Sequence, residues 1–401
     1  MFSLFSPKKL TKANLVLDIG SKSVGGAIFN TAPSGRPHLL YAVREPIGLS
    51  IELTGHKLQR DMLKSLNKVL VRLDGFKTGR MKRGNHRTDS ISAVISSPWH
   101  ASETKILSLK FGKPTIITKA TVDNLSAEEE KSFEKSLAGS EQTAGGFELL
   151  ERKIIEMRLN GYSTGKPYGK TASMLEVLMF ESVAPSNLLQ EIKSAVAKHF
   201  PPEHLRFHTF SSAAFASLRD LFPETEDFLI IQIDGEVTDV SVVKKGIILG
   251  TVSFPVGHNS ILRTLSDICE GHPNCTLESL LSMHGKKAAA AHDTEKVERA
   301  IAETKQRWLE QFNSVIGSFS SEAFLPKSVF LFEDGSYASL FQKFLSEVGS
   351  DQFTITAEPF AVTIIGSELA PTFAEIPKTV LSDSPLSIEA NFIARLEKER
   401  A

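Results

Sequence analysis

The chain contains little cysteine, no long apolar run and no excess of either charge. Only two of its 401 residues are cysteine, which argues against a disulfide framework and is typical of a reducing compartment. No apolar run approaches the roughly 18 residues that a membrane-spanning helix needs, and residues 1–9 are too short to hold a secretory signal. A formal net charge of −1 gives no global attraction to nucleic acid or to an acidic membrane. These absences predict a cytoplasmic protein that binds no nucleic acid.

Two similar segments, more than two hundred residues apart, carry the strongest pattern in the chain. Residues 15–29 and 228–243 each consist of an apolar run, a turn of small and polar residues, and a second apolar run. This pattern predicts two β-hairpins whose turns have about the length at which backbone N–H groups cradle a phosphate. Two such hairpins facing each other across a cleft are typical of the nucleotide clamp of actin-like ATPases. With 401 residues, the chain is long enough for two or more lobes that each bury a core.

Between the two hairpins, the sequence pattern changes from helical spacing to a basic loop and then to a block of short strands and helices. Residues 58–73 place apolar side chains on one face of an expected helix. A basic loop follows at residues 74–87, which is either a solvated insertion or a contact for anionic lipid or an acidic partner. Residues 88–200 then show short strand patterns and two helices, the first starting at Thr121 and the second spanning 186–199. We expect a small separate α+β subdomain in this block.

Five different short motifs follow one another along residues 12–370. They lie at residues 17–21, 121–124, 159–177, 211–216 and 254–259. In this order they resemble the family of the bacterial division protein FtsA and the type IV pilus protein PilM. The resemblance implies an actin-like (ribonuclease H-like) two-lobed α/β fold with an inserted SHS2-like α+β subdomain. The implied boundaries are 12–87 for the first lobe, 88–200 for the insert, 201–380 for the second lobe and 386–401 for a C-terminal amphipathic helix or tail.

The resemblance also assigns residues to nucleotide binding, with ATP and Mg²⁺ as the implied cofactor. The assigned residues are Asp18, Gly20, Ser21 and Lys22 in the first hairpin, Gly235 and Thr238 in the second, Glu303 and Lys305 on a long helix, and Gly335 and Ser336 at the adenosine turn. Asp18 and Asp234 are the expected Mg²⁺ ligands, since carboxylate oxygens suit this cation.

The second hairpin departs from the family pattern. Gln232 stands where the family has a carboxylate that orients Mg²⁺ and the attacking water. Acidic residues replace glycines at Asp234 and Glu236, and again at Glu333 and Asp334 in the adenosine turn. Two unit charges about 4 Å apart interact by roughly 4 kcal/mol at an effective dielectric constant of about 20. We therefore predict weak nucleotide binding and no catalytic residue; the alternative is an active Mg-dependent ATPase whose carboxylates hold the metal in an unusual way.

The function implied by the resemblance is that of a scaffold at the cytoplasmic face of the cell membrane. Its expected partner is either a tubulin-like division filament or a cytoplasmic peptide of a membrane-bound pilus protein, and self-association is a further expectation. The sequence alone leaves the choice between cell division and pilus assembly open.

Three short segments leave further alternatives open. Near the C-terminus, Ile388, Phe392 and Leu396 have helical spacing, in the region where FtsA-type proteins carry a membrane-targeting helix. Acidic residues in the same segment equally favour a helix that docks on a partner or on the chain itself. Residues 2–9 form a second candidate anchor, and the Cys/His group at 269–275 has too few ligands for a typical structural zinc site.

Overall fold

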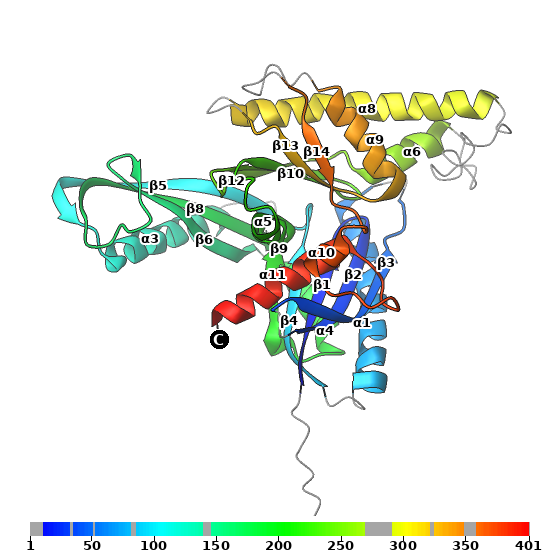
Figure 1. Cartoon of the computed structure of the whole chain (residues 1–401), viewed down its shortest axis with the longest axis horizontal. Helices are drawn as coiled ribbons and strands as arrows, with labels where there is room; N and C mark the ends of the chain where they lie inside the picture. The colour runs from blue at the N-terminus through cyan, green and yellow to red at the C-terminus, as the bar shows by residue number, and fades with distance from the viewer. Residues whose placement is uncertain are drawn as a thin grey trace, which may run out of the picture.

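The computed structural model describes residues 11–32, 35–50, 53–81, 86–138, 146–268, 291–320, 325–348 and 358–400. Three sheets organise these residues into two lobes and a projecting insert (Figure 1). The candidate anchor at 2–9 and the Cys/His group at 269–275 lie outside the described residues, and the basic loop expected at 74–87 is described only up to residue 81 and from residue 86.

The first lobe is built on a five-stranded sheet in the order β3-β2-β1-β4-β9. Its strands are β1 (Thr11–Ile19), β2 (Ser23–Thr31), β3 (Pro37–Pro46), β4 (His86–Ile95) and β9 (Leu205–Thr209). β1 pairs antiparallel with β2 and parallel with β4. One face is covered by α1 (Gly55–Phe76) and α4 (Ser186–Ala197). The apolar face predicted for α1 is buried there, at Leu58, Met62, Leu66, Val69 and Leu73.

The second lobe repeats this sheet with unrelated residues, in the order β12-β11-β10-β13-β14. Its strands are β10 (Phe228–Ile233), β11 (Thr238–Lys244), β12 (Ile247–Phe254), β13 (Ser328–Phe332) and β14 (Ala361–Ile364). The outer helices are α6 (His258–Ile268), α8 (Ala291–Ser320) and α9 (Gly335–Ser346). Their core includes Trp308 and Phe312 of α8, which stack with ring centroids 4.8 Å apart. The predicted pair of hairpins therefore forms the start of two equivalent sheets.

The space between the two sheets is filled by α5 (Phe210–Leu221), α11 (Ser384–Arg400) and the short α10 (Ala370–Phe373). The apolar side chains of α11, among them Ile388 and Phe392, are buried in one core with Val16 of the first sheet and Phe228 of the second. The expected C-terminal helix is therefore present, and its apolar face is covered by the chain itself.

The insert is a four-stranded antiparallel sheet in the order β5-β8-β6-β7. Its strands are β5 (Ala101–Ile116), β6 (Phe147–Leu159), β7 (Tyr162–Ser163) and β8 (Thr171–Pro185). Helix α3 (Lys119–Ala138) covers one face, where Val122 packs with Leu175 and Val177. The insert is shorter than the block expected at 88–200, because β4 pairs with β1 and α4 packs on α1, both in the first lobe.

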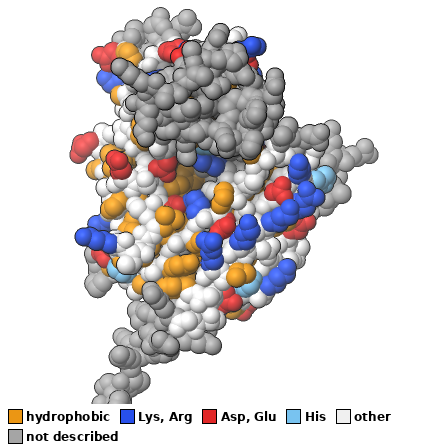
Figure 2. Space-filling view, turned by 90° about the vertical axis from the view of Figure 1, so that its right-hand side faces the viewer, with side chains coloured by type: hydrophobic (Ala, Val, Ile, Leu, Met, Phe, Trp, Pro, Cys, Tyr) orange, Lys and Arg blue, Asp and Glu red, His pale blue; other side chains and the backbone are white. Residues whose placement is uncertain are grey.

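The exposed side of α1 is basic. Arg60, Lys64, Lys68 and Arg72 are exposed at intervals of four residues, and a π-helical turn, η1 (Lys77–Met81), continues the helix. Figure 2 shows the side of the molecule on which α1 lies, with Lys and Arg side chains gathered on it. A short 3₁₀ turn, η2 (Pro202–His204), precedes β9. None of the helices in the described ranges has the length and apolarity to cross a membrane.

Candidate functional site

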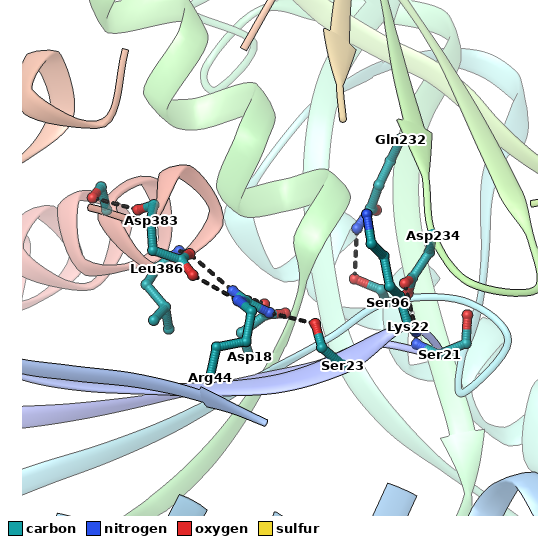
Figure 3. A network of polar contacts seen from close by, with 11 residues as sticks. Asp18, Ser21, Lys22, Ser23, Arg44, Ser96, Gln232, Asp234, Asp383 and Leu386 are labelled. Carbon is teal, nitrogen blue, oxygen red and sulfur yellow. Dashed lines mark hydrogen bonds and ion pairs between the residues drawn. The ribbon is translucent and has the colours of Figure 1, made fainter. Parts of the chain in front are cut away.

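The turns of the two hairpins meet at the junction between the lobes. The N–H groups of Ser21 and Lys22 in the first lobe donate to the carboxylate of Asp234 in the second lobe, at 2.7 and 2.9 Å (Figure 3). The N–H of Gly235 donates to the same carboxylate at 2.7 Å. Burial raises the pKa of Asp234, although its three backbone hydrogen bonds act in the opposite direction. The amide groups expected to hold a phosphate therefore hold a carboxylate of the opposite lobe.

Glycine makes this close approach of the two turns feasible. A Cβ atom on Gly20 would lie 2.5 Å from Asp234 Oδ2, and one on Gly235 would lie 2.6 Å from the carbonyl oxygen of Ser21. The N–H of Glu236 adds a further bond between the lobes, to Ser21 Oγ at 2.9 Å. The glycines that the family pattern associates with a phosphate thus accommodate the other turn of the same chain.

Asp18, expected as a Mg²⁺ ligand, is held by an arginine. Arg44 on β3 lies 2.7 Å from the Asp18 carboxylate, donates to Asp383 at 2.6 and 2.8 Å, and donates to Ser23 Oγ at 2.9 Å (Figure 3). Burial raises the pKa of Asp18 to about 6, with Arg44 opposing this shift and Asp383 adding to it. Burial also raises the pKa of the adjacent Glu389 well above its usual range. In this cluster, a single arginine is therefore the common positively charged partner of the Asp18 and Asp383 carboxyl groups.

Lys22, expected to contact the phosphates, is paired with the acid that replaces a glycine at the adenosine end. Its Nζ atom lies 2.5 Å from Glu333 Oε1, and His258 Nδ1 lies 3.4 Å from Glu333 Oε2. Burial alone would raise the pKa of Glu333, but His258 and Lys22 together lower it below its usual range. The neighbouring Asp334 accepts a hydrogen bond from the N–H of Ser367 at 2.7 Å. Both acids of the adenosine turn therefore have partners within the chain.

The other two residues that differ from the family pattern, Gln232 and Glu236, also have polar partners within the chain. Gln232 donates from Nε2 to Ser96 Oγ at 2.9 Å, across the lobes. The carboxylate of Glu236 is buried, forms an ion pair with Arg263 and accepts a hydrogen bond from Asn259 Nδ2 at 2.8 Å. Gln232 thus binds a serine hydroxyl where the family carries a carboxylate.

Other predicted site residues lie deeper or at the margin. The hydroxyl of Thr238 is buried, donates to the carbonyl oxygen of Val256 at 2.6 Å and accepts from Trp308 Nε1 at 3.0 Å, so it supports the core of the second lobe. Gly335 lines the cleft at the start of α9. Ser336 follows it on the same helix, but its side chain is outside the described part of the structure.

Glu303 and Lys305 do not reach the cleft. Glu303 pairs along α8 with Arg299 at 2.8 Å, and Lys305 pairs with Glu347 at 2.8 Å. Neither residue lines the cavity between the lobes. Their expected contacts with ribose and base are therefore not provided by this arrangement.

The cleft between the lobes has a volume of about 670 Å³ and an acidic lining. Its charged lining residues are Asp18, Lys22, Arg44, Asp234, Glu333, Asp334 and Asp383. Mg·ATP does not fit this arrangement, because the amide groups expected to bind its phosphates donate to Asp234, and Lys22 and Arg44 are paired with carboxylates. Within the described ranges, no group of three or more His, Cys, Asp or Glu side chains is placed to hold a metal ion.

Sequence reasoning missed two arginines that pair with acids of the hairpins, Arg44 with Asp18 and Arg263 with Glu236. A signal for Arg44 exists in the first hairpin, because Gly25 pairs with Asp18 on one side and with Arg44 on the other. A Cβ atom on Gly25 would lie 2.9 Å from Arg44 Nη2, so the glycine gives the arginine room to reach Asp18. Arg263 has no comparable local signal, since it reaches Glu236 from another element.

A second hollow, which we call the insert groove, lies between the insert and helices α5 and α11. It has a volume of about 270 Å³. Its apolar lining includes Ile154, Ile155, Phe180, Phe215, Ala216, Ile248, Phe392 and Leu396, and its charged lining residues are Lys153, Arg219, Arg395 and Glu399. In the described sheet, β7 pairs only with the last two residues of β6, and the N–H of Thr164 donates to the carbonyl oxygen of Met157 at 3.0 Å. Residues 147–156 are therefore not paired with a strand of this sheet on that edge, although Glu151 contacts β9 there.

A buried polar cluster fixes β6 against the first lobe beside the insert groove. Glu151 of β6 accepts hydrogen bonds from Thr209 Oγ1 at 2.8 Å and from Ser212 Oγ at 2.7 Å, and it lies 3.1 Å from His208 Nδ1. Burial alone would raise the pKa of Glu151, but His208, Lys153 and Ser212 together lower it to about 2. The wall of the groove formed by β6 is therefore anchored by an ionised side chain.

The comparisons with known proteins agree with this architecture. No protein-family model matches the chain, and no curated protein matches it. A chain of the PilM–PilN type IV pilus biogenesis complex matches with a TM-score of 0.55 and 13% identity, over 96% of this chain and 98% of that one. An actin-like ATPase-fold protein of unknown function from Bacteroides thetaiotaomicron matches with a TM-score of 0.41 and 7% identity, over 98% and 99%. The ethanolamine utilization protein EutJ from Carboxydothermus hydrogenoformans matches with a TM-score of 0.38 and 11% identity, over 97% and 93%.

The chain therefore has the actin-like, two-lobed α/β fold that the sequence resemblance implied. Its fold is similar to that of a chain in the PilM–PilN complex over almost the whole length of both. At this level of identity the likeness establishes the fold alone.

Proposed function

We propose that the chain is a non-catalytic scaffold of the FtsA/PilM type that binds a cytoplasmic segment of a membrane-bound pilus protein. The observation that carries the proposal is the insert groove, an apolar hollow beside an unpaired edge of β6. The cleft supports the non-catalytic part, because its phosphate-binding amides, lysine and arginine all have partners within the chain.

The chemistry of the insert groove favours an extended segment with apolar side chains. An unpaired strand edge offers backbone hydrogen bonds to an incoming strand, while pockets beside it select alternate side chains. Phe215 and Phe392 supply apolar surface in the groove. Its cations are already paired with acids of the chain, Arg395 with Asp220 and Glu399 and Lys153 with Glu151.

The likeness to the PilM–PilN complex supports a pilus protein as the partner. A tubulin-like filament and a second copy of the chain are the other partners to be separated by experiment. We further propose that membrane association is peripheral and passes through the partner, since the apolar face of α11 is buried in the core. Deleting residues 386–401 would remove part of that core, so point substitutions are needed to test this proposal.

A matched pair of surface substitutions provides the test. Ile154 of β6 lines the insert groove and is 40% exposed, whereas Ile106 of β5 lies outside it and is 56% exposed. In the full chain, Ile154→Asp should weaken binding of a synthetic peptide from the cytoplasmic segment of the pilus protein by about tenfold or more. The same variant should move from the membrane fraction to the soluble fraction of cells, while Ile106→Asp should keep both properties.

Thermal unfolding of both variants controls for folding. Equal binding and equal membrane association of the two variants, at equal melting temperature, would refute the insert groove as the docking site. Binding of a tubulin-like filament that is sensitive to Ile154→Asp, without peptide binding, would redirect the proposal to cell division.

A further inference from the structure

The turn at residues 20–22 has the construction of an oxyanion site. Its successive backbone N–H groups converge on one carboxylate, that of Asp234, which is buried. Turns with converging N–H groups are general binding sites for phosphate and carboxylate groups. The bound carboxylate belongs to the opposite lobe, so the bond that fills the site also joins the lobes.

We propose that the turn at residues 20–22 is a retained oxyanion site whose occupant is the chain's own Asp234 carboxylate, which replaces a phosphate and closes the cleft without nucleotide. This inference concerns the cleft and does not depend on the partner bound in the insert groove.

Three residues that differ from the family pattern each form a contact that joins the two lobes. Gln232 binds Ser96, Asp234 binds the first turn, and Glu333 binds Lys22, each across the two lobes. Random decay of a nucleotide site would leave acidic side chains that repel one another or point into solvent. Here the replacements form complementary contacts, as expected for a cleft whose closed form is held by protein groups alone.

Vacating the site should make it bind a small oxyanion from solution. In Asp234→Gly the N–H groups of residues 21 and 22 lose their acceptor, so the melting temperature of the full chain should fall by several degrees. Sodium acetate or inorganic phosphate should restore much of this loss in a saturable way, while sodium chloride at equal ionic strength should not.

The neighbouring acid Asp334 provides a matched control. It lines the same cleft, but its carboxylate binds Ser367 within the second lobe. Asp334→Gly should show no saturable recovery of its melting temperature with acetate or phosphate. The melting temperature of wild type should change only gradually with each salt, as it does for any folded protein whose surface excludes these anions. An equal response of all three proteins would refute the retained oxyanion site.

A second measurement does not require the glycine variant to fold. Small-angle X-ray scattering of the wild-type chain should give the same radius of gyration with and without Mg·ATP, because the lobes are already joined. Asp234→Asn, which keeps the size of the side chain but removes its charge, should give a larger radius than wild type. An open wild-type chain that contracts on addition of Mg·ATP would overturn the proposal.

Discussion

The two hairpins occupy equivalent positions in their sheets but distribute charge in opposite ways. Three cross-strand neighbours can be compared directly from the strand registers. They are Asp18, Gly25 and Arg44 in the first sheet, and Gln232, Asp239 and Ser253 in the second. The acid stands on the first strand of one lobe and on the second strand of the other, so the same backbone accommodates two arrangements of a buried carboxyl group.

The two carboxyl groups are stabilised by different means. Burial raises the pKa of both Asp18 and Asp239 to about 6. Asp18 has a full countercharge in Arg44, whereas Asp239 accepts a hydrogen bond from the neutral hydroxyl of Ser253 at 2.5 Å. The comparison teaches that the carboxyl group of Asp18 depends on a countercharge and that of Asp239 on a neutral donor, so the two positions should respond differently to substitution.

The largest effect is expected from removing the countercharge in the first lobe. Arg44→Met leaves Asp18 and Asp383 without their shared partner and should lower the free energy of unfolding by about 3–5 kcal/mol. Arg72→Met is the control, because Arg72 is 55% exposed and its ion pair with Glu45 should contribute about 0–1 kcal/mol. Urea unfolding measures both, and equal losses would show that the first lobe does not depend on its charge network.

An intermediate effect is expected from neutralising the acid in the second lobe. The pKa of Asp239 is about 6 in the folded chain and near 3.8 in the unfolded chain, so the folded state binds more protons between these values. Ionisation of Asp239 therefore costs stability as the pH rises from about 4 to 6. Asp239→Asn removes this dependence, so its stability relative to wild type should rise by up to about 3 kcal/mol between pH 4 and pH 7.

Urea unfolding at several pH values tests this prediction. Asp18→Asn should show a similar rise over the same range, because the pKa of Asp18 is also about 6, but it should start from a lower stability, since it removes a partner of Arg44. A difference between Asp239→Asn and wild type that does not change with pH would contradict the assignment of a raised pKa to Asp239.

The smallest effect is expected from copying the acid of the first lobe into the second. Gln232→Asp restores the carboxylate of the family pattern but leaves Asp234 bound to the N–H groups of Ser21 and Lys22. We expect little Mg-dependent ATP turnover in wild type and no gain in this variant, measured as phosphate release. Robust turnover by wild type, abolished in Asp18→Ala, would instead establish the active-ATPase alternative.

Local sequence patterns predicted the elements whose pairing is local. The two strands of the first hairpin and the buried face of α1 follow from the pattern of apolar runs and from helical spacing, since both depend on residues near in the chain. The placement of β4 and α4 in the first lobe did not follow, because it depends on a parallel partner and a helix contact far along the sequence. Apolar spacing in α11 likewise predicted a helix but could not show what covers it.

At the site, the sequence showed which groups are unusual but not where they bind. Asp234 and Glu333 were recognised as acids in glycine positions and were expected to repel phosphate. Their actual partners, the turn at residues 20–22 and the side chain of Lys22, lie more than two hundred residues away in the chain. Such pairings depend on the closed arrangement of two lobes, which no local pattern encodes.

The burial of α11 also imposes an order on biosynthesis. Its Glu397 accepts hydrogen bonds from Asn14 and Ser90, both at 2.7 Å, and the first of these partners lies 383 residues earlier in the chain. At translation rates of about 5–20 residues per second, Asn14 emerges from the ribosome roughly 20–80 s before Glu397. The face of the first sheet that α11 covers therefore stays exposed on the nascent chain for most of that time. A ribosome that stops shortly before residue 384 releases a product with an open apolar face, a typical substrate for chaperones and proteases.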